Sequence, residues 1–469
     1  MPLSFFALVP LCLVLERRRT FLLGWWHGLI FWATSMVWIL GTLTTYGQLA
    51  GWLAGISLLL LGLWLGIYTA LFAWIGAPLW RSGGWRALLG LPALWVVLEV
   101  ARGVLFTGFP WNLAAHSWLR LPGALPLSAW IGAWGVSFLV LFVNLALARA
   151  WVEKRWEIGA LALLLVATLL AAGGRWGSGE PEGVGEARQR TAVVVQPNTQ
   201  NQVSFDSRRF EIAYARLLEL SNGACEPGRL LLWPESAAWP LAYDRDPRLA
   251  ADIARLNARG CSVLFNSTSQ EGSRYFNSLL LADEASRIQR YDKRHLVPFG
   301  EYVPLAGVFT FIKSIARNAG DFSPASELDL LDWKGERLGP ALCYEVVFPG
   351  EVAEVVRAGA TVLVTATNDA WYGDSAAPWQ HLAAARFRAA ESRRFLLRAA
   401  ITGVSAVIAP NGALRGQLGV GEAGTLVARV LGESELSPFS RAPWLVPAVA
   451  AMVTLAACLA ARRRRLKLL

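Results

Sequence analysis

Long apolar runs separated by short basic clusters are the feature that most constrains this chain. A helix needs about 20 apolar residues to cross the hydrocarbon core of a bilayer. Such runs cover residues 21–41, 52–76, 87–106, 128–148, 157–173 and 443–461, and a shorter run covers residues 2–15. The sequence therefore predicts a polytopic α-helical membrane protein with six N-terminal spans and one C-terminal span.

The basic residues between the runs predict the orientation of the chain. Cytoplasmic loops of membrane proteins carry an excess of lysine and arginine. Clusters of these residues lie at every second connection, at residues 17–19, 81–86, 149–155 and 462–467. This alternation puts the segment between residues 174 and 440 on the outer side. It also puts the N-terminus outside, which is the less common arrangement, so we expect one further helix before residue 1.

Charge is distributed unevenly along the 469 residues. The chain is 55% hydrophobic and 17% charged, whereas an average soluble protein has about 25% charged residues. Most charges fall between residues 174 and 440, so we expect a membrane domain at 1–173, a large outer domain at 174–440 and a C-terminal helix with a basic tail at 441–469. The net charge of +10 comes from the clusters that set topology, and no nucleic acid partner is expected.

The outer domain alternates short β-branched apolar runs with amphipathic segments. Strands are expected at residues 191–196, 229–233, 262–266, 277–282, 341–344 and 361–365. Helices are expected at residues 205–220, 246–259, 350–358 and 376–398. This order predicts an α/β domain whose strands are covered on both faces.

Signatures of metals and cofactors are missing from the sequence. Its five cysteines form no CxxC pair, its four histidines form no HExxH motif, and no GxxxxGK[ST] loop occurs. We therefore expect neither a metal ion nor a cofactor.

Three expected strand ends carry a reactive side chain. They are Glu235 in WPES, Lys293 in DKRHLVPFGEYVP and Cys343 in LCYE. Each has an ordinary interpretation by itself: a carboxylate in the first turn of a helix, a solvated lysine and a small buried thiol. Together they suit thiol catalysis, because a carboxylate can take the thiol proton and an ammonium group can stabilise the thiolate and an oxyanion. Glu301 adds a second carboxylate that can orient Lys293.

These motifs, with NDAWYG and PWQH at residues 368–373 and 378–381, resemble those of apolipoprotein N-acyltransferases. That family is a membrane-embedded branch of the nitrilase superfamily. The strings LEVARG and TGFPW at residues 98–103 and 107–111 resemble its motif between membrane helices. The resemblance covers nearly the whole chain. It implies an α-β-β-α sandwich for the outer domain.

The resemblance also implies a ping-pong acyl transfer. Cys343, activated by Glu235, attacks the sn-1 ester of a phospholipid, preferably phosphatidylethanolamine. Lys293 and a backbone N–H near Tyr344 hold the oxyanion. The α-amino group of the diacylglyceryl-cysteine at the N-terminus of an apolipoprotein then takes the acyl group.

Further expectations follow from the same resemblance. Glu301, Tyr344 and Glu345 support the three catalytic side chains. The partners are a phospholipid donor, diacylated apolipoproteins and membrane lipids, and the protein is a monomer. It lies in the bacterial inner membrane with its catalytic domain in the periplasm.

Two other functions remain open from the residues alone. A membrane-tethered nitrilase-type amidase or hydrolase would use the same triad but pass the acyl group to water. A membrane scaffold would carry an inactive domain of the same fold. The motifs in the membrane region favour the transferase over the hydrolase, and the complete triad argues against the scaffold.

Five aromatic side chains are candidates for contact with substrate or lipid. Trp239, Trp371 and Trp379 lie near the motifs, and Phe309 and Phe311 lie in an apolar segment expected to be a mobile loop over the site. The alternative for all five is packing in the core of the domain.

Cys225 and Cys261 precede two of the expected strands. If these strands are parallel neighbours, both cysteines lie at the amino ends, and their Cα atoms fall within the roughly 4.4–6.8 Å that a disulfide needs. The alternative is two separate half-buried thiols, because the sequence does not fix the path of the loop around Cys225. A bond there would be structural, since the amino ends lie opposite the expected active site.

Overall fold

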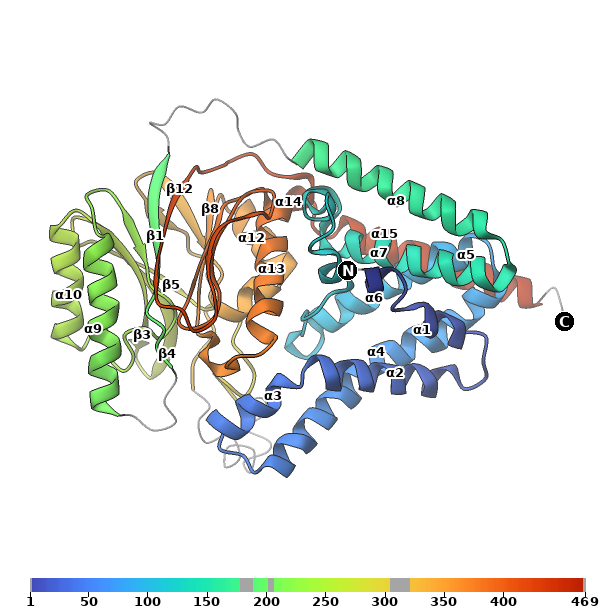
Figure 1. Ribbon diagram of the computed structural model, residues 1–469, viewed down its shortest axis with the longest axis horizontal. Coiled ribbons are helices and arrows are strands. Elements are labelled where there is room, and N and C mark those ends of the chain that lie inside the picture. The colour runs from blue at the N-terminus through green and yellow to red at the C-terminus, as the bar shows by residue number, and fades with distance from the viewer. Residues whose placement is uncertain (1, 178–188, 201–205, 304–320, 467–469) are drawn as a thin grey trace. The chain divides into compact units, whose positions relative to one another are not determined.

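The computed structural model of the chain describes residues 2–177, 189–200, 206–303 and 321–466 (Figure 1). The chain divides into two compact units. The helical unit comprises Met1–Leu40, Gly51–Glu180 and Ser437–Leu469, and the α/β unit comprises Gly41–Ala50 and Pro181–Leu436. We describe each unit separately.

The helical unit consists mainly of long apolar helices. Its main elements are α2 (Thr20–Ser35), α4 (Gly51–Ser82), α6 (Gly90–Val104), α7 (Ala124–Glu153), α8 (Trp156–Gly177) and α15 (Leu445–Leu466), with the short α5 (Trp85–Leu88) and α14 (Pro438–Arg441) between them. Within the described ranges, five helical segments are long and apolar enough to cross a membrane. A bent pair, Thr20–Ser35 with Trp38–Tyr46, makes a sixth if it is counted as one span.

The apolar run at residues 2–15 differs from its expected form as a span. It holds a 3-10 helix, η1 (Pro2–Phe5), and a six-residue helix, α1 (Val9–Val14). Pro10 lies in the first turn of α1, where its missing N–H is tolerated, but it cannot continue a helix from the residues before it. At about 1.5 Å per residue, α1 is far too short to cross the hydrocarbon core.

Two buried charged side chains hold the connection between α6 and α7. Glu99 accepts hydrogen bonds from the Ala114 backbone N–H (2.8 Å) and the Trp95 indole (3.0 Å). Arg102 donates to the Trp111 carbonyl (2.7 Å), and its guanidinium lies over the Trp32 ring. The LEVARG motif therefore fixes the backbone of the TGFPW motif that follows it.

The α/β unit contains two six-stranded sheets. The first has the order β12-β1-β2-β3-β4-β5, and the second has the order β11-β10-β9-β8-β7-β6. The first sheet comprises β1 (Arg190–Gln196), β2 (Leu230–Leu232), β3 (Ser262–Glu271), β4 (Arg274–Ala282), β5 (Ile288–Asp292) and β12 (Gly424–Val430). The second comprises β6 (Leu331–Trp333), β7 (Glu336–Pro340), β8 (Val362–Thr367), β9 (Leu396–Ala400), β10 (Ser405–Ile408) and β11 (Leu414–Leu418).

Both sheets repeat one topology. β1, β2 and β3 are parallel and are connected by α9 (Ser207–Ala224) and α10 (Pro247–Ala258). β7, β8 and β9 are parallel and are connected by α12 (Pro349–Arg357) and α13 (Ala377–Ser392). Two antiparallel strands follow each parallel set. The sequence shows no repeat, so this correspondence appears only in three dimensions.

Alternation of side chains along the strands creates four layers. In β1, Val194 faces a core that also contains Val364 and Leu397 of the second sheet. Its neighbour Val193 faces the opposite side, where Tyr214 of α9 and Ile253 of α10 pack. Helices α9 and α10 cover the first sheet, and α12 and α13 cover the second (Figure 1). The expected α-β-β-α sandwich is confirmed.

Two expected elements are wrong in detail. A strand is expected at residues 341–344, but strand β7 ends just before them, at Pro340. Cys343 instead begins a 3-10 helix, η6 (Cys343–Val347). The long helix expected at residues 376–398 ends at Ser392, because Arg393 adopts a left-handed conformation (φ 54°). Residues 396–400 then form β9 between β8 and β10, where tertiary pairing overrides the helical propensity of an alanine- and arginine-rich segment.

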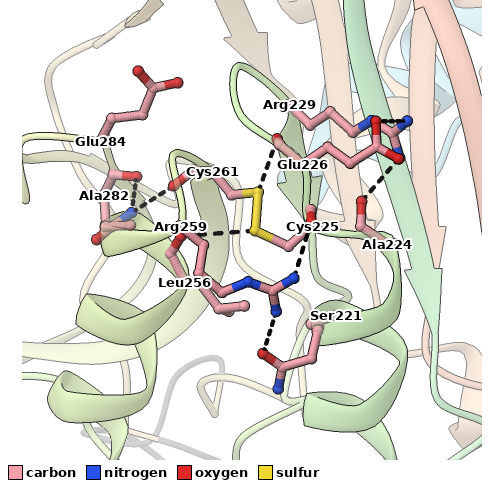
Figure 2. Close-up of a disulfide and its surroundings, with 12 residues drawn as sticks. Ser221, Ala224, Cys225, Glu226, Arg229, Leu256, Arg259, Cys261, Ala282 and Glu284 are labelled. Carbon is pink, nitrogen blue, oxygen red and sulfur yellow. Dashed lines mark hydrogen bonds and ion pairs between the residues drawn. A yellow bond between two sulfur atoms is a disulfide. The ribbon is translucent and has the colours of Figure 1, made fainter.

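A disulfide joins Cys225 and Cys261 (Figure 2). Strands β2 and β3 are parallel neighbours, and the Cα atoms of the two cysteines are 5.9 Å apart. Arg259 donates a hydrogen bond to the Cys225 carbonyl (3.2 Å) and helps to fix the loop before β2 (Figure 2). The alternative of two separate thiols is therefore wrong.

Candidate active site

Glu235 lies just beyond the carboxyl end of β2 and is only 6% exposed. Its carboxylate accepts a hydrogen bond from the side-chain amide of Asn277 on β4 (2.9 Å). It accepts a second from the backbone N–H of Asn368, directly after β8 (3.0 Å). One carboxylate thus joins the ends of both sheets, which fixes its orientation in the buried site.

Lys293 directly follows β5 and is 1% exposed. Its Nζ lies 2.9 Å from both carboxylate oxygens of Glu301 and 3.7 Å from Glu235 Oε1. Burial opposes its charge, but the carboxylates of Glu301 and Glu235 outweigh that effect and raise the pKa of Lys293. The side chain is therefore a permanent ammonium group at neutral pH.

Glu301 is oriented by two further donors. The Asn277 side-chain amide donates to it (2.6 Å), and the Val297 backbone N–H donates to its other oxygen (2.8 Å). Asn277 therefore contacts both carboxylates that flank the Lys293 ammonium. The sequence interpretation missed Asn277, because a single asparagine in an apolar strand carries no local signal of this role.

Cys343 is 8% exposed and has a left-handed backbone conformation, with φ at 52°. Its Sγ lies 3.2 Å from Thr367 Oγ1, and its carbonyl accepts a hydrogen bond from His381 Nε2 (3.0 Å). Burial and the nearby Glu235 carboxylate raise the pKa of the thiol, and the Lys293 ammonium acts in the opposite direction. The resting side chain is therefore a neutral thiol.

Glu345 connects the segments that carry Lys293 and Cys343. One of its oxygens accepts from the backbone N–H groups of Arg294 (2.7 Å) and His295 (3.0 Å). The other accepts from the Tyr291 hydroxyl (2.8 Å) and the Leu342 backbone N–H (2.7 Å). Burial raises the pKa of this carboxyl, while Lys293 lowers it. Through these contacts Glu345 holds together the segments that follow β5 and β7.

The aromatic side chains expected to touch lipid fall into two groups. Trp239, Trp371 and Trp379 are 55%, 41% and 45% exposed, so core packing is wrong for these three. Phe309 and Phe311 lie outside the described residues. Tyr344 is buried, and its ring meets Phe348 edge-on at 5.0 Å.

A second buried polar cluster adjoins Cys343. It consists of Thr367, Asp369, His381 and Arg398, all buried and connected by hydrogen bonds. Asp369 and His381 belong to motifs that the sequence interpretation singled out only as family strings. Arg398 was missed because it was assigned to a helix. Among the described residues, no group of three or more His, Cys, Asp or Glu side chains is arranged to hold a metal ion.

The match to a family model defines the class of the α/β unit as a carbon-nitrogen hydrolase. A family model described as carbon-nitrogen hydrolase matches residues 193–433. A crystal structure of a CN-hydrolase superfamily protein from Xanthomonas campestris is 21% identical, with a TM-score of 0.39, and the match covers 55% of this chain and 96% of that one.

Relatives that match over most of the chain identify the family within this class. The apolipoprotein N-acyltransferase of Geobacter metallireducens is 36% identical over 456 residues, which are 92% of this chain and 86% of that protein. The apolipoprotein N-acyltransferase of Ralstonia nicotianae is 33% identical over 459 residues, which are 94% and 85% of the two chains. A model described as the apolipoprotein N-acyltransferase N-terminal domain also matches residues 1–146. The chain belongs to the apolipoprotein N-acyltransferase family.

Proposed function

We propose that this protein transfers a fatty acyl chain from a phospholipid to the N-terminus of apolipoproteins through a thioester on Cys343. The observation that carries the proposal is the buried ammonium of Lys293 between two carboxylates, close enough to Cys343 for its charge to act on the thiol. A neutral thiol, a base and a fixed positive charge are the parts that acyl transfer requires.

The first half-reaction forms the thioester. Glu235 takes the Sγ proton as Sγ attacks the carbonyl carbon of the sn-1 ester. Lys293 and a backbone N–H near Tyr344 hold the oxyanion. The ester C–O bond then breaks, and the leaving oxygen takes the proton from Glu235 as lysophospholipid departs. Phosphatidylethanolamine is the preferred donor.

The second half-reaction moves the acyl group to nitrogen. The α-amino group of the diacylglyceryl-cysteine attacks the thioester carbon, and Glu235 takes a proton from that nitrogen. The C–S bond breaks, and the proton returns to Cys343. Glu301 keeps the Lys293 ammonium in place through both steps, and Glu345 keeps the two strand ends together.

Two observations support a periplasmic α/β unit and an inner-membrane helical unit. The basic clusters at residues 17–19, 81–86, 149–155 and 462–467 favour the cytoplasmic side for the connections that contain them. The disulfide between Cys225 and Cys261 suits an oxidising compartment such as the periplasm. Both substrates are lipids of the outer leaflet, so the site belongs on that side, and a single chain supplies every catalytic group.

The exposed tryptophans are the proposed contacts for the acyl chains. Trp371 stands beside Tyr46, with the ring centroids 5.2 Å apart, and its carbonyl accepts a hydrogen bond from the Thr42 hydroxyl (2.8 Å). Trp239 follows Glu235 by four residues, and Trp379 lies in the first turn of α13, within the PWQH motif. Phe309 and Phe311 complete this proposed set.

Mass spectrometry of a lipoprotein N-terminus tests the function. Cells that contain the protein should yield a triacylated N-terminal cysteine, and cells that lack it or carry Cys343→Ala should yield a diacylated cysteine with a free amine. A membrane-tethered hydrolase would instead release free fatty acid and leave the lipoprotein unchanged. That result would contradict the proposed transfer while preserving the thiol chemistry.

A further inference from the structure

Thr367 presents its hydroxyl to the sulfur of Cys343. It is the last residue of β8 and is fully buried. Its Oγ1 lies 3.2 Å from Cys343 Sγ and 2.9 Å from Asp369 Oδ1. A hydroxyl has one proton, so it can donate to only one of these two acceptors at a time.

Asp369 is held by a buried cation. Its other oxygen accepts from Arg398 Nη2 (2.6 Å), and the same Nη2 lies 3.2 Å from His381 Nδ1. Despite burial, the Arg398 guanidinium and the hydrogen bond from the Thr367 hydroxyl bring the pKa of Asp369 to about 2. The carboxylate is therefore ionised at neutral pH.

His381 links this cluster to the backbone of the nucleophile. Its Nε2 lies 3.0 Å from the Cys343 carbonyl, and that geometry requires the proton on Nε2. Burial and Arg398 lower the pKa of His381, so the imidazole is neutral, and its Nδ1 accepts from Arg398. The cluster thereby holds the carbonyl of a residue whose backbone is left-handed.

We propose that Thr367 is a further catalytic residue, whose hydroxyl turns from Asp369 to the Cys343 sulfur when the thiol ionises. Asp369, His381 and Arg398 are positioning residues, which hold the Thr367 oxygen and the Cys343 carbonyl in place. The proposal rests on Cys343 being the nucleophile of the proposed function. No atom is transferred by Thr367, because the thiol proton goes to Glu235 and the hydroxyl keeps its own.

The direction of the turn follows from acceptor strength. A neutral thiol is a weak acceptor and a carboxylate a strong one, so the resting hydroxyl donates to Asp369. Once the Sγ proton is on Glu235, the thiolate becomes a charged acceptor and competes for the same hydroxyl.

The charged and titratable groups that face the sulfur set this balance. They are Glu235 after β2, Lys293 after β5, and Asp369 and Tyr372 in η7 (Asp369–Tyr372). The carboxylates of Glu235 and Asp369 oppose the thiolate, whereas Lys293 and the Thr367 hydroxyl favour it. Once Glu235 is protonated, Thr367 and Lys293 are the groups left to stabilise the sulfur charge against Asp369.

The strand supplies a matched control. Thr365 lies two residues before Thr367 on the same face of β8 and is also fully buried. Within the described part of the chain, its hydroxyl has no hydrogen-bond partner. Thr365→Val and Thr367→Val therefore make the same chemical change at two equally buried positions, and only the second removes a contact with sulfur.

The experiment compares Thr367→Val, Thr367→Ser and Thr365→Val in the full-length enzyme in detergent. Single-turnover thioester formation and the pH profile of Cys343 alkylation by iodoacetamide are measured, with the melting temperature as a check on folding. We expect Thr367→Val to slow thioester formation by about 10-fold or more, the factor that corresponds to one hydrogen bond to a charged group, and to raise the apparent pKa of Cys343. Thr367→Ser should restore most of both values, and Thr365→Val should change neither.

Two results would overturn the role of Thr367. One is an unchanged alkylation profile and rate in Thr367→Val. The other is an equal loss in Thr365→Val, which would mark a packing effect. Cys343→Ala separates this failure from that of the proposed function: an acyl label that persists in Cys343→Ala contradicts the nucleophile itself, and with it the proposal.

His381 has its own test. His381→Gln keeps an N–H that can donate to the Cys343 carbonyl, so it should retain most of kcat and an unchanged alkylation profile. His381→Leu should lower kcat without raising KM for either lipid. If kcat fell in both variants only in proportion to a fall in melting temperature, His381 would act only through packing.

Discussion

Removing the disulfide should destabilise the α/β unit without affecting its chemistry. The bond joins residues 36 positions apart, and the chain-entropy relation gives about 4 kcal/mol for a loop of that length. In a unit of roughly 250 residues, 1 kcal/mol shifts the melting temperature by about 2 °C. The double variant Cys225→Ala/Cys261→Ala should therefore melt about 8 °C lower than the wild type.

Scanning calorimetry of the full-length protein in detergent measures this shift. A thiol reductant should lower the wild-type transition to that of the double variant and should leave the double variant unchanged. Cys458→Ala, which removes a free thiol from α15, serves as the control and should keep both the wild-type transition and its response to the reductant. Thioester formation at 25 °C should be equal in all three proteins, because the bond lies at the amino end of β2 and Glu235 at its carboxyl end.

The prediction would be refuted if the double variant had the same melting temperature as the oxidised wild type. That result would mean that the bond does not form or that it constrains nothing in the unfolded chain. A double variant with normal stability but slow thioester formation would contradict the separation of the bond from the active site.

Three further predictions concern the site itself. Glu235→Gln should slow thioester formation by at least 100-fold, the usual effect of losing a general base, and should lower the apparent pKa of Cys343 in alkylation, because the lost charge raised it. Lys293→Met should slow thioester formation by a similar factor but raise the apparent pKa of Cys343, because the lost ammonium lowered it. Shifts of the same sign in the two variants would refute the charge assignment. Replacing Trp239, Trp371 and Trp379 by serine should raise KM for phospholipid at unchanged melting temperature, since these side chains are exposed, and an unchanged KM would remove them from lipid binding.

Local sequence was sufficient for the α/β class of the outer domain and for locating Glu235 and Lys293 after buried strands, whereas the four-layer sandwich was implied by the family resemblance. Buried strands were visible as short β-branched runs, and residues at their carboxyl ends meet at one edge of a sheet. Glu235 and Lys293 come close together for this reason, at 3.7 Å. The error at residues 341–344 has a local cause as well: the strand stops at Pro340, and Cys343 needs a left-handed turn that an apolar run does not reveal.

The roles of the residues that the sequence did not reveal depend on contacts between positions far apart in the chain. Asn277 contacts Glu235 across 42 positions, and Arg398 contacts Asp369 across 29. Arg398 is buried in a strand only because β8 and β10 flank it, whereas its neighbours in sequence favour a helix. The sequence alone does not decide whether Cys225 and Cys261 pair, for a similar reason. The path of the loop at Cys225 depends on Arg259 after α10.

The mass of Cys343 after incubation with phospholipid tests the central claim most directly. The purified full-length protein, incubated with phosphatidylethanolamine alone, should gain one fatty-acyl mass on the peptide that contains Cys343, and hydroxylamine should remove it. A diacylated lipopeptide added afterwards should discharge the same label. Cys343→Ala should take up no acyl group. A label on another residue, or an acylated product formed by Cys343→Ala, would contradict the thioester mechanism.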